Sequence, residues 1–401
     1  MRIGIIREGK IPSDNRVPLT PRQCAHISEF YPVDFVIEPS EDRCFKDEEY
    51  ASEGLLLSSD LSQCDVLMGV KEVPITQLLP GKTYFFFSHT IKKQPYNRKL
   101  LQALLDKNIR MIDYEVLRDV MGQRLIAFGH YAGIVGAHNA LWTYGKRTGL
   151  FSLSRACESH DYEVLRQQYS QVKFPPVKIC LTGNGRVANG AIDVLKDMKI
   201  REVSPEDYLA KEFDEIVFTQ LHGRHYVRNI SGDPFVKNEF YNHPERFESS
   251  FLPYAASTDI FINAIYWDSR SPRFFSLEDM KSPSFRIKII ADITCDIAPE
   301  SSVPSTLRAS TIADPVYGYN PVTGGLEEPF SPTVIDVMAI DNLPNELPRD
   351  ASDFFGKQFI ENILSELLHQ EESAIIDNAT ICRDGRLTPM YEYLSDFAAG
   401  R

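Results

Sequence analysis

A lysine and a histidine stand directly after two successive apolar runs, where side chains that handle protons could meet a substrate. Residues 65–70 run into Lys71, and residues 83–87 run into Ser88 and His89. If the two runs are neighbouring parallel strands, both side chains face one crevice, because ligands of open α/β sheets bind beyond the carboxyl ends of strands. An ammonium and an imidazole placed together can exchange protons near neutral pH. The alternatives are a solvated loop lysine and a strand-end histidine bonded to the backbone.

Other charged residues fall at similar positions. Glu115 follows the strand-like run 109–114, and a carboxylate there could orient His89 or pair with Lys92. Its alternative role is that of a helix N-terminal glutamate favoured by the helix dipole. Asp341 also ends an apolar run, and we expect it to reach back into the same crevice. A cation such as Lys92 near Lys71 should lower the pKa of that lysine, which suits a base near neutral pH.

A glycine turn in the middle of the chain predicts a dinucleotide site. Residues 177–195, VKICLTGNGRVANGAIDVL, read as a strand, a tight turn and the start of a helix. Gly183 allows the sharp turn, and Gly185 lets backbone N–H groups approach a pyrophosphate at the positive end of the helix. An ordinary strand-to-helix turn is the alternative. The residues of this turn that we assign to cofactor binding are Gly183, Gly185, Arg186 and Val187.

The strand expected after this turn, residues 199–203, leaves the choice of cofactor open. An acidic residue near its end would bind the ribose hydroxyls of NAD, and Glu202 is the candidate. Arg201 precedes it, and an arginine there could accommodate the 2′-phosphate of NADP. We therefore expect NAD or NADP as the cofactor.

Composition narrows the class of protein. The chain has 401 residues, of which 43% are hydrophobic and 25% charged, so it is expected to be globular with two domains. The net charge of −13 argues against nucleic-acid and membrane partners, and leaves a small-molecule substrate. Seven scattered cysteines without a C-x-x-C pair favour reduced thiols in the cytoplasm. No signal peptide or membrane span is expected, and a monomer or small homo-oligomer is the expected assembly.

We predict no metal site. His222 and His225 are the histidines close enough in sequence to share a metal, but no cysteine stands beside them. They lie in a polar, loop-like stretch, so they are interpreted as solvated surface residues.

The alternation of strand-like and helix-like segments predicts an α/β fold with two Rossmann-like, doubly wound domains and an active-site cleft between them. The first domain is expected to comprise residues 1–130 and 331–401, and the dinucleotide-binding domain residues 131–330. A long helix from His130 links the two, and 124–128 is expected to be a short strand. The segment 311–321 is expected to be a loop, and helices are expected over 352–368 and 371–376.

Several long motifs resemble a known family. The opening REGKIPSDNRVPLTP resembles the clan of alanine dehydrogenase, transhydrogenase and saccharopine dehydrogenase. GVKEVP and FFFSHTIKKQ look more narrowly like the lysine-forming saccharopine dehydrogenases and the lysine–ketoglutarate reductase half of bifunctional lysine-degrading enzymes. STLRASTIADPVYGYNP and IDNLPNELPRDAS are similar to the same group. The resemblance covers Met1 to about Asp396, although the nucleotide turn GNGRVANGA departs from the expected pattern.

The resemblance implies an oxidoreductase that interconverts saccharopine with L-lysine and 2-oxoglutarate, using a nicotinamide cofactor. It implies that Lys71 and His89 handle the protons. It further implies charged neighbours that tune this pair, carboxylate-binding arginines and a site aspartate: Lys92, Glu115, Arg16, Arg124 and Asp341. The rival readings are an alanine dehydrogenase-type enzyme of the same fold and a non-catalytic nucleotide-sensing relative.

Overall fold

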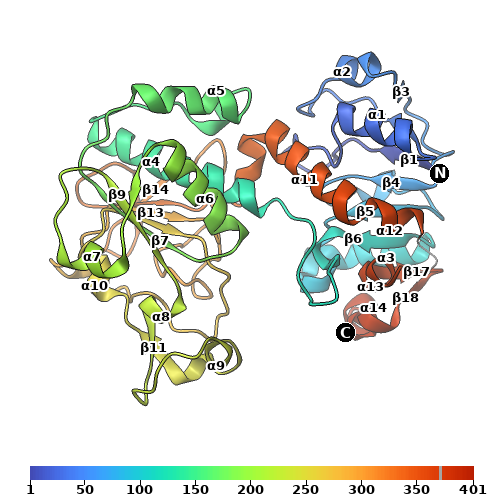
Figure 1. Ribbon diagram of the computed structural model, residues 1–401. Coiled ribbons are helices and arrows are strands. Elements are labelled where there is room, and N and C mark those ends of the chain that lie inside the picture. The colour runs from blue at the N-terminus through green and yellow to red at the C-terminus, as the bar shows by residue number, and fades with distance from the viewer. Residues whose placement is uncertain (370–372) are drawn as a thin grey trace. The chain divides into compact units, whose positions relative to one another are not determined.

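The computed structural model describes residues 1–369 and 373–401 (Figure 1). The chain forms two compact units, one made of residues 1–128 and 348–401 and the other of residues 129–347. Each unit has an 8-stranded, mostly parallel sheet, so the predicted α/β class with two Rossmann-like units is confirmed. The start of the helix expected over 371–376 lies outside the described residues.

The first unit is built on strands of two to four residues in the spatial order β18-β17-β6-β5-β4-β1-β2-β3. The strands are β1 (Arg2–Ile5), β2 (Asp34–Ile37), β3 (Leu56–Leu57), β4 (Val66–Met68), β5 (Thr83–Phe86), β6 (Arg110–Asp113), β17 (Thr380–Arg383) and β18 (Arg386–Leu387). Those from β1 to β6 pair in parallel, whereas β17 pairs antiparallel with β6 and β18.

Helices cover both faces of this sheet. They are α1 (Pro21–Phe30), α2 (Asp47–Ser52), α3 (Arg98–Asp106), α11 (Pro348–Asn362), α12 (Leu364–Leu368), α13 (Ala374–Ala379) and α14 (Ser395–Ala399). Tyr84 and Phe86 of β5 pack with residues of α3 and α14. Phe85 faces the other way, and its ring meets that of Phe359 on α11 edge to face at 6.0 Å. The alternation of side chains along β5 therefore buries both faces of the sheet.

The second unit has the strand order β15-β14-β16-β13-β12-β7-β9-β8. Its strands are β7 (Lys178–Thr182), β8 (Arg201–Glu202), β9 (Val217–Leu221), β12 (Ile260–Asn263), β13 (Ile289–Asp292), β14 (Tyr317–Tyr319), β15 (Leu326–Glu327) and β16 (Ile335–Met338). The strand beside β7 is β9, and β8 lies outside it. This order matters because the residue that reads the cofactor ribose normally follows the strand next to the first one.

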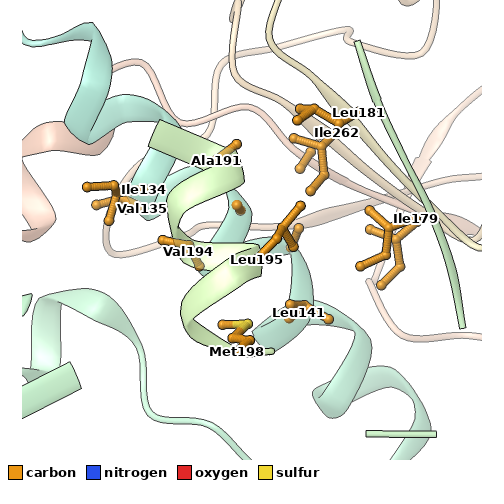
Figure 2. Packing of buried hydrophobic residues seen from close by; sticks show 14 of the residues in the cluster. Ile134, Val135, Leu141, Ile179, Leu181, Ala191, Val194, Leu195, Met198 and Ile262 are labelled. Carbon is orange, nitrogen blue, oxygen red and sulfur yellow. The ribbon is translucent and has the colours of Figure 1, made fainter. Parts of the chain in front are cut away.

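Two helices pack closely on one face of this sheet. They are α4 (Gly129–Thr148) and α6 (Arg186–Asp197), and Figure 2 shows their apolar side chains meeting those of β7 and β12. A Cβ added to Gly133 would lie 1.8 Å from the carbonyl oxygen of Val187, and one added to Gly190 would lie 1.9 Å from that of His130. Glycines therefore allow the two helix backbones to touch. Gly190 thus serves the contact between α6 and α4.

The opposite face of the second sheet is covered by α7 (Pro205–Ala210), α10 (Leu252–Ala255) and aromatic loop residues. Beyond β9, the helices α8 (Gly223–Tyr226) and α9 (Lys237–Asn242) flank a two-stranded ribbon of β10 (Val227–Asn229) and β11 (Phe247–Ser249). In Figure 1 this segment, residues 223–249, extends away from the sheet. Its own small core consists of Val227, Phe240 and Phe247.

The sequence-based expectations differ from the structure at several places. Residues 331–347, expected in the first domain, lie in the second unit because β16 pairs with β13. The expected strand over 124–128 is reduced to a single bridge between Arg124 and Arg118. The expected loop 311–321 contains β14, which pairs antiparallel with β16.

Candidate active site

Lys71 and His89 lie at the same edge of the first sheet. β4 and β5 are parallel neighbours, and the chain after β4 is bonded to the chain after β5 from Phe87 N–H to the Val70 carbonyl at 3.0 Å. The two strands are therefore parallel neighbours, which is what the prediction of a shared crevice requires. His89 itself adopts a left-handed backbone conformation, with φ of 52°, directly where the strand ends.

Glu72, the residue after Lys71, joins His89 to Lys10 through its carboxylate. Its Oε1 lies 2.6 Å from His89 Nδ1, and its Oε2 accepts a bond from Lys10 Nζ at 3.0 Å. Although burial opposes ionisation, the hydrogen bond and charge of His89 lower the pKa of Glu72 to about 2. An ionised carboxylate can only accept, so Nδ1 carries the hydrogen and Nε2 is the ring atom left for proton exchange.

Glu8 holds the backbone on which Lys71 sits. Its carboxyl oxygens accept the N–H groups of Val70 at 2.6 Å and Lys71 at 2.8 Å. Burial, reinforced by the Asp14 carboxylate, raises the pKa of Glu8 to about 8. Glu8 therefore joins the loop after β1 to the loop after β4 and fixes the starting point of the Lys71 side chain.

Lys71 has a lowered pKa, and the structure supplies the cause. Burial lowers the pKa of its ammonium, and the nearby cations of Arg16 and Lys10 lower it further. From the sequence we expected Lys92 to be the cation next to Lys71, but Lys92 Nζ instead pairs with Glu115 Oε1 at 3.4 Å. Of the three roles considered for Glu115, the structure shows pairing with Lys92 and a place in the first turn of the 3-10 helix Tyr114–Val116, whereas Glu72 is the residue that orients His89.

The two arginines suggested for carboxylate binding lie on aromatic rings of the first unit. Arg16 is 4% exposed, its guanidinium bonds Asp14 and lies 4.2 Å from the centre of the Phe128 ring. Arg124 donates from Nε to the Ile126 carbonyl at 3.0 Å, and its guanidinium lies 5.3 Å from the centre of the Phe87 ring. Their roles toward a substrate stay predictions.

A buried serine and aspartate fix the end of β5. Asp113 Oδ2 accepts the Ser88 N–H at 3.0 Å and the Ser88 hydroxyl at 2.6 Å, while Oδ1 accepts the Glu115 N–H at 2.8 Å. Glu115 Oε2 is buried and has no hydrogen-bond partner among the described residues. The strand end thus leaves one carboxylate oxygen as an available acceptor near Lys92.

Asp341 lies in the second unit and not in the first, where it was expected. It follows β16 in chain order, and its charge raises the pKa of Cys295 together with burial and Asp292. This residue is therefore held by the sheet of the second unit.

The glycine turn joins β7 to α6, the connection predicted for a dinucleotide site. Gly183 has φ of 108°, and a Cβ there would lie 2.4 Å from the Ala264 carbonyl oxygen. Gly185 has no protein atom within 4 Å of an added Cβ, so the described structure itself does not demand a glycine there. Gly185 is the N-cap of α6, a helix of 12 residues, and provides no side-chain cap for the helix. The side chain of Arg186 is exposed, whereas that of Val187 packs into the core, so Val187 offers its backbone.

A buried polar network supports the strand ends behind this turn. Thr182 donates to Asn263 Oδ1 at 3.0 Å, and Asn263 donates to Asp292 Oδ1 at 2.9 Å. Thr294 and Thr306 also donate to Asp292, at 2.7 and 2.6 Å. Burial raises the pKa of Asp292, and its hydrogen bonds show that this aspartate braces β7, β12 and β13.

Two open hollows lie beside the turn, at the carboxyl end of β9. Each has a volume of about 420 Å³, and His222 and Arg224 line both. One hollow includes Gly183 and Asn184 of the turn, and the other, the second hollow, includes Glu202 and Glu206. Arg201 pairs with Glu215 at 2.7 Å. Arg201 and Glu202 were assigned to the cofactor ribose on the expectation that their strand lies next to β7. The strand next to β7 is β9 and not β8, so this expectation is not met, and the role of the two residues is untested.

Sequence reasoning missed three features of these sites. Glu72 follows Lys71 directly in the motif GVKEVP, and this adjacency was the available signal, whereas no signal in the sequence joins Glu8 of the motif REGK to Lys71. The His222–Arg224 segment was interpreted as solvated surface because β9 was not recognised as the strand beside β7.

Within residues 1–369 and 373–401, no helix is long and apolar enough to cross a membrane. The same residues contain no group of three His, Cys, Asp or Glu that could hold a metal ion.

Comparison with known sequences identifies relatives of the whole chain. Residues 4–135 match the family model described as alanine dehydrogenase/PNT, N-terminal domain. The chain is 30% identical to the mitochondrial alpha-aminoadipic semialdehyde synthase of Rattus norvegicus over 97% of its own length and 47% of the rat protein. It is 27% identical to the saccharopine dehydrogenase (NAD+, L-lysine-forming) of Emericella nidulans, over 88% of this chain and 89% of the fungal one. The chain thus spans about half the length of the first of these relatives.

Solved structures support the fold. An L-alanine dehydrogenase superimposes with a TM-score of 0.65 at 15% identity, covering 99% of this chain and all of that one. A transhydrogenase from Sinorhizobium meliloti gives a TM-score of 0.56 at 13% identity, covering 97% of this chain and 99% of the other. The resemblance seen in the sequence motifs is confirmed: this chain is a relative of the saccharopine dehydrogenases over most of its length, and its first third matches the N-terminal domain of alanine dehydrogenases.

Proposed function

We propose that this protein is a nicotinamide-dependent oxidoreductase that interconverts saccharopine with L-lysine and 2-oxoglutarate. The single observation that carries the proposal is the arrangement after β4 and β5, where the half-buried Lys71 is followed by Glu72, whose carboxylate bonds the ring of His89. The relatives named saccharopine dehydrogenase support the choice of substrate. The turn at Gly183 and Gly185 would hold the cofactor, NAD or NADP, through backbone N–H groups.

The reaction needs proton transfers at two places. In the cleavage direction, a C–H bond next to the secondary amine of saccharopine loses a hydride, and water adds to the resulting C=N carbon. The C–N bond then breaks, so that saccharopine, water and oxidised cofactor yield lysine, 2-oxoglutarate, reduced cofactor and a proton. The nicotinamide supplies the hydride acceptor when it is bound.

The residues of the first unit meet the demands of proton transfer. Lys71 has a lowered pKa, so its neutral amine is accessible as a base nearer to neutral pH than that of a solvated lysine. His89 presents Nε2, because Nδ1 is engaged with Glu72. We assign to this pair the removal of a proton from the attacking water and the protonation of the departing amine. Arg16, Arg124 and Lys92 are the proposed cations for the substrate carboxylates, and Asp341 and Glu115 are proposed as further site residues.

The test is a panel of substrates with the purified chain. We expect oxidation of NADH or NADPH in the presence of L-lysine and 2-oxoglutarate, and no comparable rate with pyruvate and ammonia. Turnover only with pyruvate and ammonia would show an alanine dehydrogenase-type enzyme. Cofactor binding without turnover of either pair would show a nucleotide-sensing protein, and both results would overturn the proposal.

A further inference from the structure

The helix α11 bonds through two polar side chains to the loops that carry the arginines proposed for substrate carboxylates. We propose that Gln358 and Ser352 of this helix are positioning residues. They hold Arg124 and Arg16 in place for a substrate with two carboxylates. The inference rests on the proposed function, which supplies 2-oxoglutarate as that substrate.

The loop that carries Arg124 receives little support from the sheet. Arg124 forms a single bridge with Arg118, and the residues after it belong to no strand or helix of the described chain until α4 begins. Gln358 supports this loop from α11, because its Oε1 accepts the Ala127 N–H at 3.2 Å and its Nε2 donates to the Ala127 carbonyl at 3.1 Å. One side chain thus satisfies both backbone polar groups of a buried residue.

The head group of Arg124 is tied to the same piece of backbone. Its Nε donates at 3.0 Å to the carbonyl of Ile126, the residue before Ala127. The position of the guanidinium therefore depends on the backbone that Gln358 holds.

Ser352 holds the backbone next to Arg16 in a similar way. Arg16 lies in the loop between β1 and α1, and the N–H of the following residue, Val17, donates to Ser352 Oγ at 2.9 Å. The Ser352 hydroxyl itself donates to the Pro348 carbonyl at 2.6 Å, so its oxygen is left to accept from Val17. Ser352 and Val17 are both buried, so the N–H would stay unpaired without this hydroxyl.

Phe355 lies between these two residues on α11 and packs on the rings that the arginines contact. The centre of its ring is 4.3 Å from that of Phe128 and 6.1 Å from that of Phe87. The Arg16 guanidinium lies over the Phe128 ring, and the Arg124 guanidinium lies over the Phe87 ring. One helix therefore fixes a backbone segment and a ring for each guanidinium. Two cations held at a fixed separation favour a ligand with two carboxylates.

The alternative is that these contacts of α11 serve stability alone. Loss of either hydrogen bond would then lower the free energy of unfolding and leave the choice between one and two carboxylates unchanged. A measurement of ligand selectivity separates the two roles.

The experiment compares 2-oxoglutarate with 2-oxobutyrate, which lacks the second carboxylate and is otherwise the same acid. Both are titrated calorimetrically into the full chain with reduced cofactor present and L-lysine absent. We expect 2-oxoglutarate to bind about 10- to 100-fold more tightly, as charge-assisted hydrogen bonds to one carboxylate would give. In Gln358→Met, and separately in Ser352→Ala, this advantage should shrink about three- to tenfold.

Asn362→Leu is the matched control. Asn362 lies on the same helix, and its amide donates to the Gln358 carbonyl at 2.8 Å, a bond within α11. This variant should keep the advantage of the wild type. In an Arg124→Gln background, Gln358→Met should reduce the advantage by less than about twofold more, because the two residues act as one unit.

Equal binding of the two acids to the wild type would overturn the inference. So would an unchanged advantage in Gln358→Met, an equal loss in Asn362→Leu, or independent losses in the double variant. Urea unfolding checks that each variant is folded, and Ser352→Ala decides the question if Gln358→Met is not. These titrations involve no turnover. A protein that selects the dicarboxylate through these residues but turns over neither substrate pair would therefore fail the proposed function and keep this inference.

Discussion

At the scale of single residues, Glu72 is the group that orients His89, because its Oε1 lies 2.6 Å from Nδ1 of the ring. Its pKa is held at about 2 by the His89 hydrogen bond and charge against the opposing effect of burial, so it is ionised throughout the neutral range. It fixes the tautomer of His89, because an ionised carboxylate must receive the Nδ1 hydrogen. The atom of His89 left for proton exchange is therefore Nε2.

We predict that Glu72→Gln lowers kcat for the lysine and 2-oxoglutarate reaction by about 10- to 100-fold, because a charge-assisted bond that orients His89 is lost. Lys10→Met is the matched variant, since Lys10 contacts the other oxygen of Glu72 and its side chain is 39% exposed. It should change kcat less than about fivefold. Steady-state kinetics on both proteins give the measurement, and equal effects of the two substitutions would contradict the orienting role of Glu72.

Lys71 and His89 could be located from sequence because each follows an apolar run that ends in a charged motif. Their partners could not be assigned in the same way. Glu72 and Glu115 are both carboxylates near strand ends, and only the fold shows that Glu72 reaches His89 while Glu115 meets Lys92. Glu8 acts through backbone N–H groups that lie more than 60 residues away along the chain, a contact that no local pattern encodes.

At the scale of elements, the turn from β7 into α6 uses its glycines for different purposes. Gly183 is required by its positive φ and by the Ala264 carbonyl, and Gly190 by the contact of α6 with α4. A Cβ added to Gly185 would have no described protein atom within 4 Å, so protein packing does not require a glycine there. The sequence predicted the turn and its helix, whereas the close contact of two helices needed the structure.

Two alanine variants separate these roles. Gly185→Ala should change the free energy of unfolding by less than about 0.5 kcal/mol and weaken cofactor binding roughly tenfold or more. Gly190→Ala should lower the free energy of unfolding by about 1–3 kcal/mol, because a Cβ would lie 1.9 Å from the His130 carbonyl oxygen. Urea unfolding and fluorescence titration with the reduced cofactor provide the two readouts. Unchanged cofactor affinity in Gly185→Ala would contradict the pyrophosphate site.

The order of strands was the main feature of the elements that the sequence did not predict. β8 is the strand that follows α6 in the chain, and from this order alone we expected it to lie beside β7. In the structure β8 has two residues, both exposed, and it forms the edge of the sheet outside β9. Pairing between strands depends on burial over the whole sheet, so the position of β9 could not be inferred from its own residues.

At the scale of the whole molecule, each unit has its own core, and the second unit contains a buried titratable group away from the proposed chemistry. His138 on α4 is fully buried, donates from Nε2 to the Ser154 carbonyl at 2.8 Å and accepts the Tyr169 hydroxyl at Nδ1 at 2.9 Å. Burial and, to a smaller extent, the Arg155 cation lower the pKa of His138 to about 4 against the opposing effect of the Ser154 bond. The neutral ring is thus part of the folded core.

The lowered pKa of His138 predicts that the free energy of unfolding decreases in acid. The pKa of His138 is depressed on folding, so its contribution is present above about pH 6.5 and is lost as the pH falls toward 4. Between pH 8 and pH 5 the wild type should lose about 2 kcal/mol of unfolding free energy relative to His138→Gln, whose side chain does not titrate. Urea unfolding of both proteins at the two pH values gives this double difference. An identical pH dependence in the two proteins would contradict the assignment.

The central claim is that Lys71 and His89 transfer protons in the oxidation and reduction of a secondary amine. The most direct test is to measure kcat with L-lysine, 2-oxoglutarate and reduced cofactor, alongside the cofactor dissociation constant, in Lys71→Met and His89→Gln. We expect each variant to lose about 10²- to 10⁴-fold in kcat, as the loss of a general acid or base does, while the cofactor binds as in the wild type. Near-normal kcat in both variants would contradict the claim.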